Sequence, residues 1–223
     1  MIHTVAICAL GSAACLVLPA DTLRRWAPRW APLSLADPVR PTLQLGAEYF
    51  LGHGFSVGAD VGTRLVLFKA YSRPEQQVRH HTFRVEGRYY LRATGWKKRE
   101  FIAVEGFYVP YVYTQQHGIL ERNGTYFTYD EARIMHRTWG GSLKYGWHWF
   151  VGPRRRWWLE TAVGLGMRRV PSRYSRIRNE QPADSAQTYK YLNQEWRLSF
   201  PPPDGGHLDR LHLLYSLRVG YRL

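Results

Sequence analysis

Apolar and polar residues alternate with a period of two along most of this chain. The segment Thr82–Arg92 shows the pattern most clearly. Its apolar set is Phe83, Val85, Gly87, Tyr89 and Leu91, and its other set is Thr82, Arg84, Glu86, Arg88, Tyr90 and Arg92. Successive side chains of a β-strand point to opposite faces, whereas a helix would mix the two sets around its circumference. The segment therefore predicts a strand with one apolar face and one charged face.

The same alternation predicts further strands. They cover Thr42–Leu51, Phe55–Phe68, Phe101–Tyr113, Ile134–Val151, Trp157–Val170 and Leu211–Leu223, with a short first strand at Ala31–Ala36. The connections are expected to be short turns at Gly52–Gly54, Ala93–Arg99 and Gly152–Arg156, and polar loops at Ser72–Arg79, Gln115–Glu131 and Pro171–Leu208. Within the last of these, Thr188–Leu198 could extend a strand beyond the sheet. About eight strands without a composition shift predict one all-β domain, an antiparallel up-and-down barrel.

The alternation alone fits two kinds of barrel. A soluble lipocalin-like barrel binds its ligand inside an apolar interior, whereas a membrane barrel turns its apolar face outward to lipid. Aromatic residues such as Trp147, Trp149 and Trp157 gather at predicted strand ends, as in the interfacial girdles of membrane barrels. Short and long connections alternate, and strands of about 10 residues can cross a bilayer when tilted. These features favour a transmembrane β-barrel in the bacterial outer membrane, with the soluble ligand-binding barrel as the alternative.

The charged face supports the same choice. It combines both signs of charge with many glycines, which suits a narrow, filled lumen in which charges must pair. We expect a structural network of lumen charges formed by Glu48, Asp60, Arg64, Arg84, Glu86, Arg88, Glu105, Lys144, Glu160 and Arg218. The alternative is that these residues line a path for a solute. The network is preferred because side chains generally fill the interior of an eight-stranded barrel.

The N-terminal segment has a different composition. Val5–Ala20 is rich in Ala, Leu and Val, which is typical of the apolar part of a secretory signal peptide. We therefore expect residues 1–20 to be a signal peptide and residues 21–223 to be the barrel domain. Both cysteines, Cys8 and Cys15, lie in the first segment, so cleavage after it would leave a chain without disulfides. Acylation at Cys15 is the alternative.

The chain is strongly basic, with a formal net charge of +14 at pH 7. This charge raises nucleic acid as a partner, but the Lys and Arg residues form no single stripe. Many alternate with apolar residues inside strands, and others form short runs such as Lys97-Lys98-Arg99. We expect no nucleic-acid partner. The arginines of turns and loops could instead contact the phosphates of lipopolysaccharide among the outer-membrane lipids.

Three stretches carry a family resemblance. They are Leu33–Asp37 leading into Leu45–Tyr49, Arg84–Leu91, and the terminal Ser216–Leu223. In these stretches the chain resembles small outer-membrane β-barrel proteins of Gram-negative bacteria, especially an uncharacterised family described as a domain of unknown function. The last stretch is similar to the C-terminal signal read by the barrel-assembly machinery, although Leu223 stands where Phe is usual. The resemblance implies this fold, this location and this partner during biogenesis, and it implies no reaction.

The sequence offers little catalytic chemistry. The histidines lack a supporting Cys or His at metal-ligand spacing, and no Gly-rich phosphate loop is present, so we expect no metal and no cofactor. The enzyme alternative is a lipid A-modifying barrel, such as a deacylase with Ser and His facing the outer leaflet. The alternation places His136, His148 and His212 on the lumen face instead. We therefore expect a non-enzymatic protein that serves envelope integrity or interactions of its outer loops.

Overall fold

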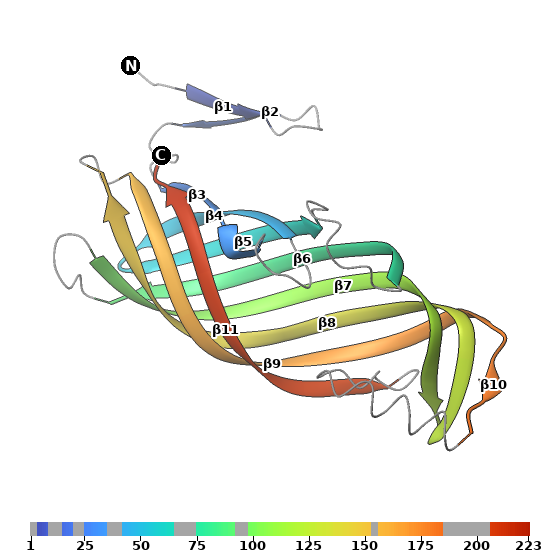
Figure 1. Cartoon of the computed structure of the whole chain (residues 1–223). Coiled ribbons are helices and arrows are strands. Elements are labelled where there is room, and N and C mark those ends of the chain that lie inside the picture. The colour runs from blue at the N-terminus through green and yellow to red at the C-terminus, as the bar shows by residue number, and fades with distance from the viewer. Residues whose placement is uncertain are drawn as a thin grey trace.

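The computed structural model describes residues 4–8, 15–19, 25–34, 42–64, 75–91, 98–152, 156–184 and 206–223. Its elements are β1 (Thr4–Cys8), β2 (Cys15–Pro19), β3 (Trp26–Trp30), the 3-10 helix η1 (Pro32–Ser34), β4 (Thr42–Gly52), β5 (Phe55–Arg64), β6 (Glu75–Tyr90), β7 (Lys98–Arg122), β8 (Thr125–Val151), β9 (Trp157–Arg178), β10 (Gln181–Pro182) and β11 (His207–Tyr221) (Figure 1). No helix within these ranges is long and apolar enough to cross a membrane.

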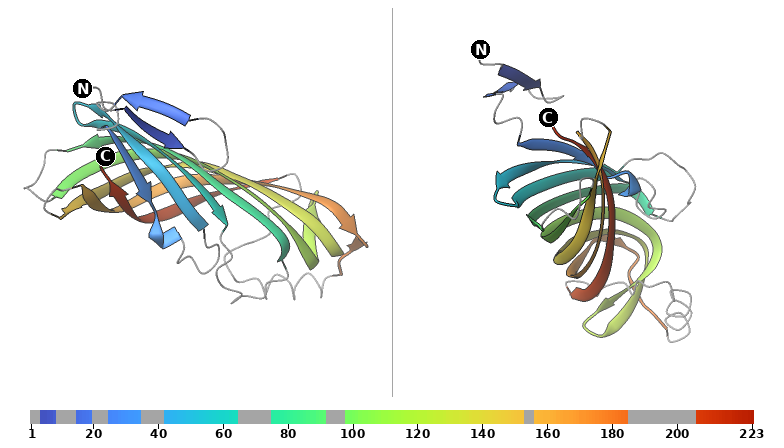
Figure 2. Two further views of the ribbon diagram at one scale, coloured as in Figure 1. Left: turned by 90° about the horizontal axis from the view of Figure 1, so that it is seen from above. Right: turned by 90° about the vertical axis from the view of Figure 1, so that its left-hand side faces the viewer.

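Antiparallel strands form a closed ring. Its order is β3, β4, β5, β6, β7, β8, β9 and β11, after which β11 pairs back to β3. β10 adds to β8 outside the ring, and β1 and β2 form a separate pair. Figure 2 shows the ring strands curving around a common interior. The predicted all-β, up-and-down barrel of about eight strands is confirmed. The signal peptide at residues 1–20 stays a prediction.

The two ends of the ring differ. At one end, here called the terminal end, the chain terminates at Leu223 and β4 turns into β5 through Gly52–Gly54, whose φ angles are 100°, 52° and 85°. At the other, the hairpin end, β7 and β8 continue past the ring as a long hairpin (Figure 1). Asn123 and Gly124 close this hairpin with φ angles of 52° and 78°. Positive φ at both central residues is the geometry of a two-residue type I′ turn, which favours Asn-Gly.

The prediction of a polar loop at Gln115–Glu131 is therefore wrong. These residues form the far part of the β7–β8 hairpin, where Arg122 pairs with Thr125. A small apolar core stabilises it, formed by the buried side chains Leu120, Tyr129, Ala132, Ile134 and Tyr174. A two-stranded hairpin is marginal by itself, so this core and the added pairing of β10 give the extension its support.

Strand ends account for the other differences. The first ring strand is Trp26–Trp30, and η1 occupies Pro32–Ser34 of the predicted strand Ala31–Ala36, whose last two residues lie outside the described ones. β6 begins at Glu75, inside the predicted loop Ser72–Arg79, and β9 continues to Arg178, inside the predicted loop Pro171–Leu208. The extra residues gain backbone partners that alternation cannot show, such as Gln115 opposite Glu75. Residues 65–68 and Thr188–Leu198 lie outside the described residues.

The apolar faces of the strands point away from the ring interior. The exposed fractions are 64% for Val85, 65% for Val104, 60% for Leu143, 55% for Leu165, 70% for Leu211 and 86% for Leu213. We call these outward side chains the apolar belt. Paired aromatic rings border it at the terminal end, with centroid separations of 5.0 Å for Trp26–Tyr49, 4.9 Å for Phe55–Tyr89 and 4.9 Å for Trp157–Tyr221. Tyr108 and Trp139, opposite each other on β7 and β8, border it toward the hairpin end.

Glycine at position 220 makes room for a buried ring. A Cβ added to Gly220 would overlap the indole of Trp158, which is only 2% exposed. We expect Gly220→Ala to displace this ring and to lower the free energy of unfolding by about 1–3 kcal/mol. Gly87→Ala is the matched control, because an added Cβ there meets nothing within 4 Å. Urea titrations in phospholipid vesicles, followed by Trp fluorescence, would measure both, and equal stability of the two variants would contradict the packing described here.

Candidate functional site

The interior of the barrel is layered, beginning with aromatic residues at the terminal end. Tyr90, Phe101 and Trp158 are buried there together with small side chains of β7 and β9. The indole of Trp158 stacks on the ring of His148, with centroids 4.4 Å apart and an interplanar angle of 12°. Phe101 lies under the guanidinium of Arg88, whose Cζ is 4.6 Å from the ring centroid. These rings form an apolar floor beneath the charged layer.

Above this floor lies a cluster of ion pairs, which we call the ion-pair plug. Its members are Arg29, Glu48, Asp60, Arg84, Glu86, Arg88, Glu105, Lys144, Glu160 and Arg218. They come from every ring strand, because each strand contributes inward side chains at the same depth. All except Arg84 are buried, so the plug excludes water from this part of the lumen.

Arg88 joins three carboxylates near the floor. Its Nη1 donates to Glu160 Oε2 at 2.7 Å and to Glu48 Oε2 at 3.1 Å, and its Nη2 donates to Glu160 Oε1 at 3.0 Å. Its Nε donates to Glu86. The hydroxyl of Tyr90 donates to Glu48 at 2.6 Å. Charge-assisted bonds of this kind offset the high cost of removing each ion from water.

Two arginines converge on Asp60. Arg29 binds it in a bidentate manner, with Nε 2.7 Å from Oδ1 and Nη2 2.9 Å from Oδ2. Arg218 donates from Nη2 to Asp60 Oδ2 at 3.0 Å and from Nη1 to Glu160 Oε1 at 3.0 Å. Gly58 leaves space for Arg29, because a Cβ there would lie 2.6 Å from the Arg29 Nη2 atom. Arg218 thus links carboxylates on opposite sides of the lumen.

Lys144 and Arg84 complete the charge balance. Lys144 Nζ donates to Glu105 Oε2 at 2.6 Å and also contacts Glu86, while Arg84 Nη1 donates to Glu105 Oε1 at 2.8 Å. The plug therefore holds five carboxylates and five cations, counted from its members above. The ten side chains of the plug together carry no net charge.

The structure places nine of the ten predicted lumen charges in this plug. Arg64 is not among them. It lies at the hairpin end of β5 with an exposed side chain, four residues beyond Asp60, where water can solvate the guanidinium. The expectation that Arg64 belongs to the lumen network is therefore wrong.

Arg29 is a plug residue that the prediction omitted. Its segment contains several prolines and was not among the predicted strands, yet Ala27 and Arg29 face inward while Trp30 is 40% exposed. The alternation over Trp26–Trp30 is the signal that could have identified it. His148 was assigned to the lumen face but not to the network, and its Nε2 lies 2.7 Å from Glu160 Oε2.

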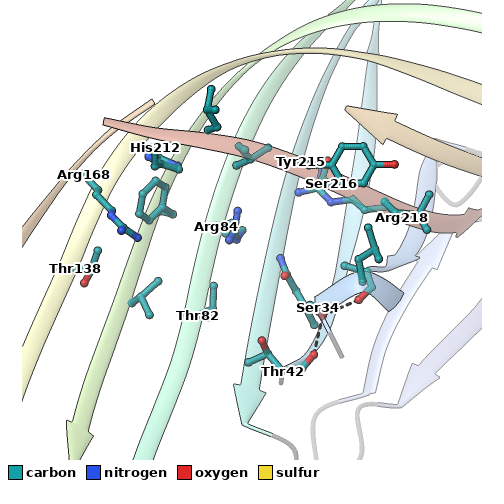
Figure 3. Close-up of a pocket in the computed structure, with 18 of the residues that line it drawn as sticks. Ser34, Thr42, Thr82, Arg84, Thr138, Arg168, His212, Tyr215, Ser216 and Arg218 are labelled. Atoms are coloured by element: carbon teal, nitrogen blue, oxygen red, sulfur yellow. Dashed lines mark hydrogen bonds between the residues drawn. The ribbon is translucent and has the colours of Figure 1, made fainter. Parts of the chain in front are cut away.

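A cavity of about 440 Å³ lies on the hairpin side of the plug (Figure 3). Its polar lining includes Gln44, Thr82, Arg84, Thr138, Arg168, His212 and Ser216. Figure 3 shows Arg84, Arg168 and His212 around the same space, with Thr82 and Thr138 nearby. Within the described part of the chain, no group of three or more His, Cys, Asp or Glu side chains is arranged to hold a metal ion. The polar side chains that line the cavity mainly carry positive charge or a hydroxyl group.

A Ser–His contact lies further toward the hairpin end. His136 on β8 and Ser172 on β9 are opposite each other, with Nδ1 and Oγ 2.5 Å apart. The other ring nitrogen, Nε2, lies 3.3 Å from the hydroxyl of Tyr113. Serine hydrolase triads use the nitrogens the other way round, since Nε2 receives the serine proton and Nδ1 binds the carboxylate. The nitrogen order at His136 is therefore the reverse of that in such triads.

Comparisons with known proteins give a family match without an activity. The profile of the family described as "Protein of unknown function (DUF3575)" matches residues 35–196. Among solved structures, the chain is similar to CarO of Acinetobacter baumannii, with 8% sequence identity and a TM-score of 0.32, over 89% of this chain and 97% of that one. A likeness at this level carries no functional argument. A search of functionally curated proteins finds no match.

Glu86 is the most connected carboxylate of the plug, in contact with Arg29, Arg88, Lys144 and Arg218. We expect Glu86→Gln to leave buried cations uncompensated and to lower the free energy of unfolding by about 3–5 kcal/mol. The measurement is urea unfolding in phospholipid vesicles.

Two further variants make this prediction specific. Adding Lys144→Met to Glu86→Gln removes one charge of each sign, so the double variant should recover much of the lost stability. Glu180→Gln removes a partly exposed partner of Arg122 and should change stability little. Equal effects of Glu86→Gln and Glu180→Gln, or a double variant as unstable as the sum of its single changes, would contradict the balance of charge in the plug.

Proposed function

The chain belongs to the DUF3575 family of proteins of unknown function, and we propose that it is an integral β-barrel of the bacterial outer membrane. The apolar belt carries this proposal. Leu143, Leu165 and Leu213 are each more than half exposed, while the carboxylates of the plug are buried. A soluble lipocalin-like barrel would have the reverse distribution, with apolar side chains inside. In a bilayer, lipid covers the belt, and the closed ring satisfies the backbone hydrogen bonds.

The proposed orientation follows from the two ends. Short turns of transmembrane barrels face the periplasm and long connections face outward. The terminal end, with the turn at Gly52–Gly54, is therefore assigned to the periplasm, and the β7–β8 hairpin to the cell surface. The aromatic pairs at the terminal end and Tyr108 with Trp139 toward the other end fit the two interfacial girdles of such barrels.

We infer a role in envelope integrity and in contacts made at the cell surface. Arg137 and Arg173 lie beyond Trp139 on the outward faces of β8 and β9, just past the belt. Guanidinium groups at this height suit the phosphates of lipopolysaccharide, because they form strong charge-assisted bonds with phosphate oxygens. The barrel-assembly machinery is the proposed partner during biogenesis.

A charged residue in the belt tests the membrane assignment. Leu143 faces outward between Tyr145 and Trp139 and lies opposite Val104. In a bilayer, Leu143→Arg should lower the free energy of unfolding by about 2–4 kcal/mol, because a guanidinium near the midplane is poorly solvated. Thr125→Arg at the hairpin tip is the control and should have little effect.

The readout is electrophoresis of unboiled against boiled membrane samples, in which the folded barrel migrates differently from the unfolded chain. Wild-type protein should show this shift in the membrane fraction, and Leu143→Arg should reduce the folded fraction. Recovery of the wild-type chain in the soluble fraction, or a soluble protein made no less stable by Leu143→Arg, would contradict the proposal.

We further propose that the barrel has no enzymatic activity of its own. The reversed nitrogen order at His136 and Ser172 supports this, because it lacks the arrangement of a serine deacylase. Lipid A extracted from a strain that lacks the protein should therefore carry the same acyl chains as wild-type lipid A by mass spectrometry. A change in acyl chains that is restored by the wild-type protein but not by Ser172→Ala would establish the enzyme alternative.

A further inference from the structure

The described lining of the cavity above the plug is rich in cationic side chains. Its described lining contains Arg84, Arg168 and Arg218 together with His80 and His212, and no carboxylate occurs among these lining residues. Arg218 faces the carboxylates of the plug, and Arg84 shares Glu105 with Lys144. The rest of the polar lining consists of Arg168, the two histidines, Gln44 and hydroxyl groups, and the cavity volume of about 440 Å³ lies in the range of small-molecule sites. A wall of this composition favours an anion.

Several polar atoms at this wall lack hydrogen-bond partners. Among the described residues, Arg84 Nε, His212 Nδ1 and Ser216 Oγ are buried without one. Buried polar atoms are almost always satisfied, and each unsatisfied one costs stability. Phe107 holds two of these groups in place, since its ring centroid is 5.8 Å from Arg84 Cζ and 5.3 Å from the His212 ring. A bound anion would satisfy donors that are already positioned.

The same cavity borders β11. Leu213, Tyr215 and Leu217 line it, although the first two point outward with exposed fractions of 86% and 63%. The cavity therefore borders a stretch of β11 whose outward side chains belong to the apolar belt. Passage beside this stretch would lead into the apolar belt.

The shortness of β3 leaves this edge of β11 without a paired strand in the described structure. β11 pairs with β9 from His207 to Tyr221, but with β3 only at Val219 and Gly220. Toward the hairpin end, the described structure pairs this edge of β11 with no strand, and η1 packs between β11 and β4 instead. Leu33 of η1 contributes to the apolar lining opposite β11.

We propose that the cavity binds a single-chain anionic amphiphile. Its carboxylate or phosphate group lies between Arg84, Arg168 and His212, and its acyl chain passes between β11 and η1 into the surrounding lipid. The head group enters the cationic wall, and the chain follows the leucines of β11 and η1, so one molecule satisfies both halves of the site. This inference rests on the proposed membrane location, because the chain leaves the barrel within the apolar belt.

The test is equilibrium binding of radiolabelled dodecanoate to the full barrel in lipid nanodiscs, with empty nanodiscs as background. Dodecanoate and dodecyl phosphate should both bind saturably, and the tighter of the two identifies the preferred head group. Arg168→Gln and Arg84→Gln should each weaken binding about tenfold or more, the usual effect of losing a charge-assisted hydrogen bond. Arg178→Gln, at the exposed hairpin end of β9, is the matched control and should bind as wild type does.

Other probes test each half of the site. Acetate and inorganic phosphate carry the charge without the chain, and dodecyltrimethylammonium carries the chain with the opposite charge, so each should bind at least about tenfold more weakly. Absence of saturable dodecanoate binding, unchanged binding by both Arg84→Gln and Arg168→Gln, or equal binding of the cationic amphiphile would overturn the proposal. The heat-dependent electrophoretic shift of each nanodisc sample reports separately whether the barrel is folded in lipid, so a failure of membrane insertion is distinguished from a failure of binding.

Discussion

Neutrality of a closed interior is the constraint on which this barrel depends. An isolated buried ion is expensive, and at the level of the plug side chains fill the ring of eight strands, so water cannot solvate such an ion there. The plug meets the constraint with equal numbers of carboxylates and cations from every ring strand. Arg88 and Arg218 act as junctions, since each contacts several carboxylates. Side-chain charge thus fixes how the strands face one another across the lumen, in addition to their backbone ladders.

The period-two alternation predicted the ring because each strand has one apolar face and one charged face. A register error of one residue would exchange the two faces. It located Glu48, Glu86 and Lys144 correctly on the inner face. It could not locate strand ends, which depend on partners far away in the chain. The Asn123-Gly124 dipeptide was a usable signal for the long hairpin, but the polar residues around it predicted a loop.

The plug and the cavity could be predicted to different degrees. Charged residues that alternate with apolar residues indicate an inward strand face, so most plug members could be predicted from the sequence. Arg29 was missed because proline is depleted in strands, and Pro28 precedes it. The cavity could not be predicted at all, since it arises where β3 ends early and β11 loses its neighbour. A void of this kind depends on the lengths of two strands that are almost the whole chain apart.

That same seam between β3 and β11 bears on how the barrel is made. Only two backbone residue pairs join these strands, but Asp60 on β5 accepts hydrogen bonds from Arg29 of β3 and from Arg218 of β11. Contacts between distant chain segments form late, because the entropy of closing a long loop opposes them. Closure of the ring is then also the step at which these guanidinium groups lose their water. The first and last strands are joined less by backbone hydrogen bonds than by the carboxylate of Asp60, which binds an arginine of each. Assembly of the barrel therefore ends with the formation of ion pairs.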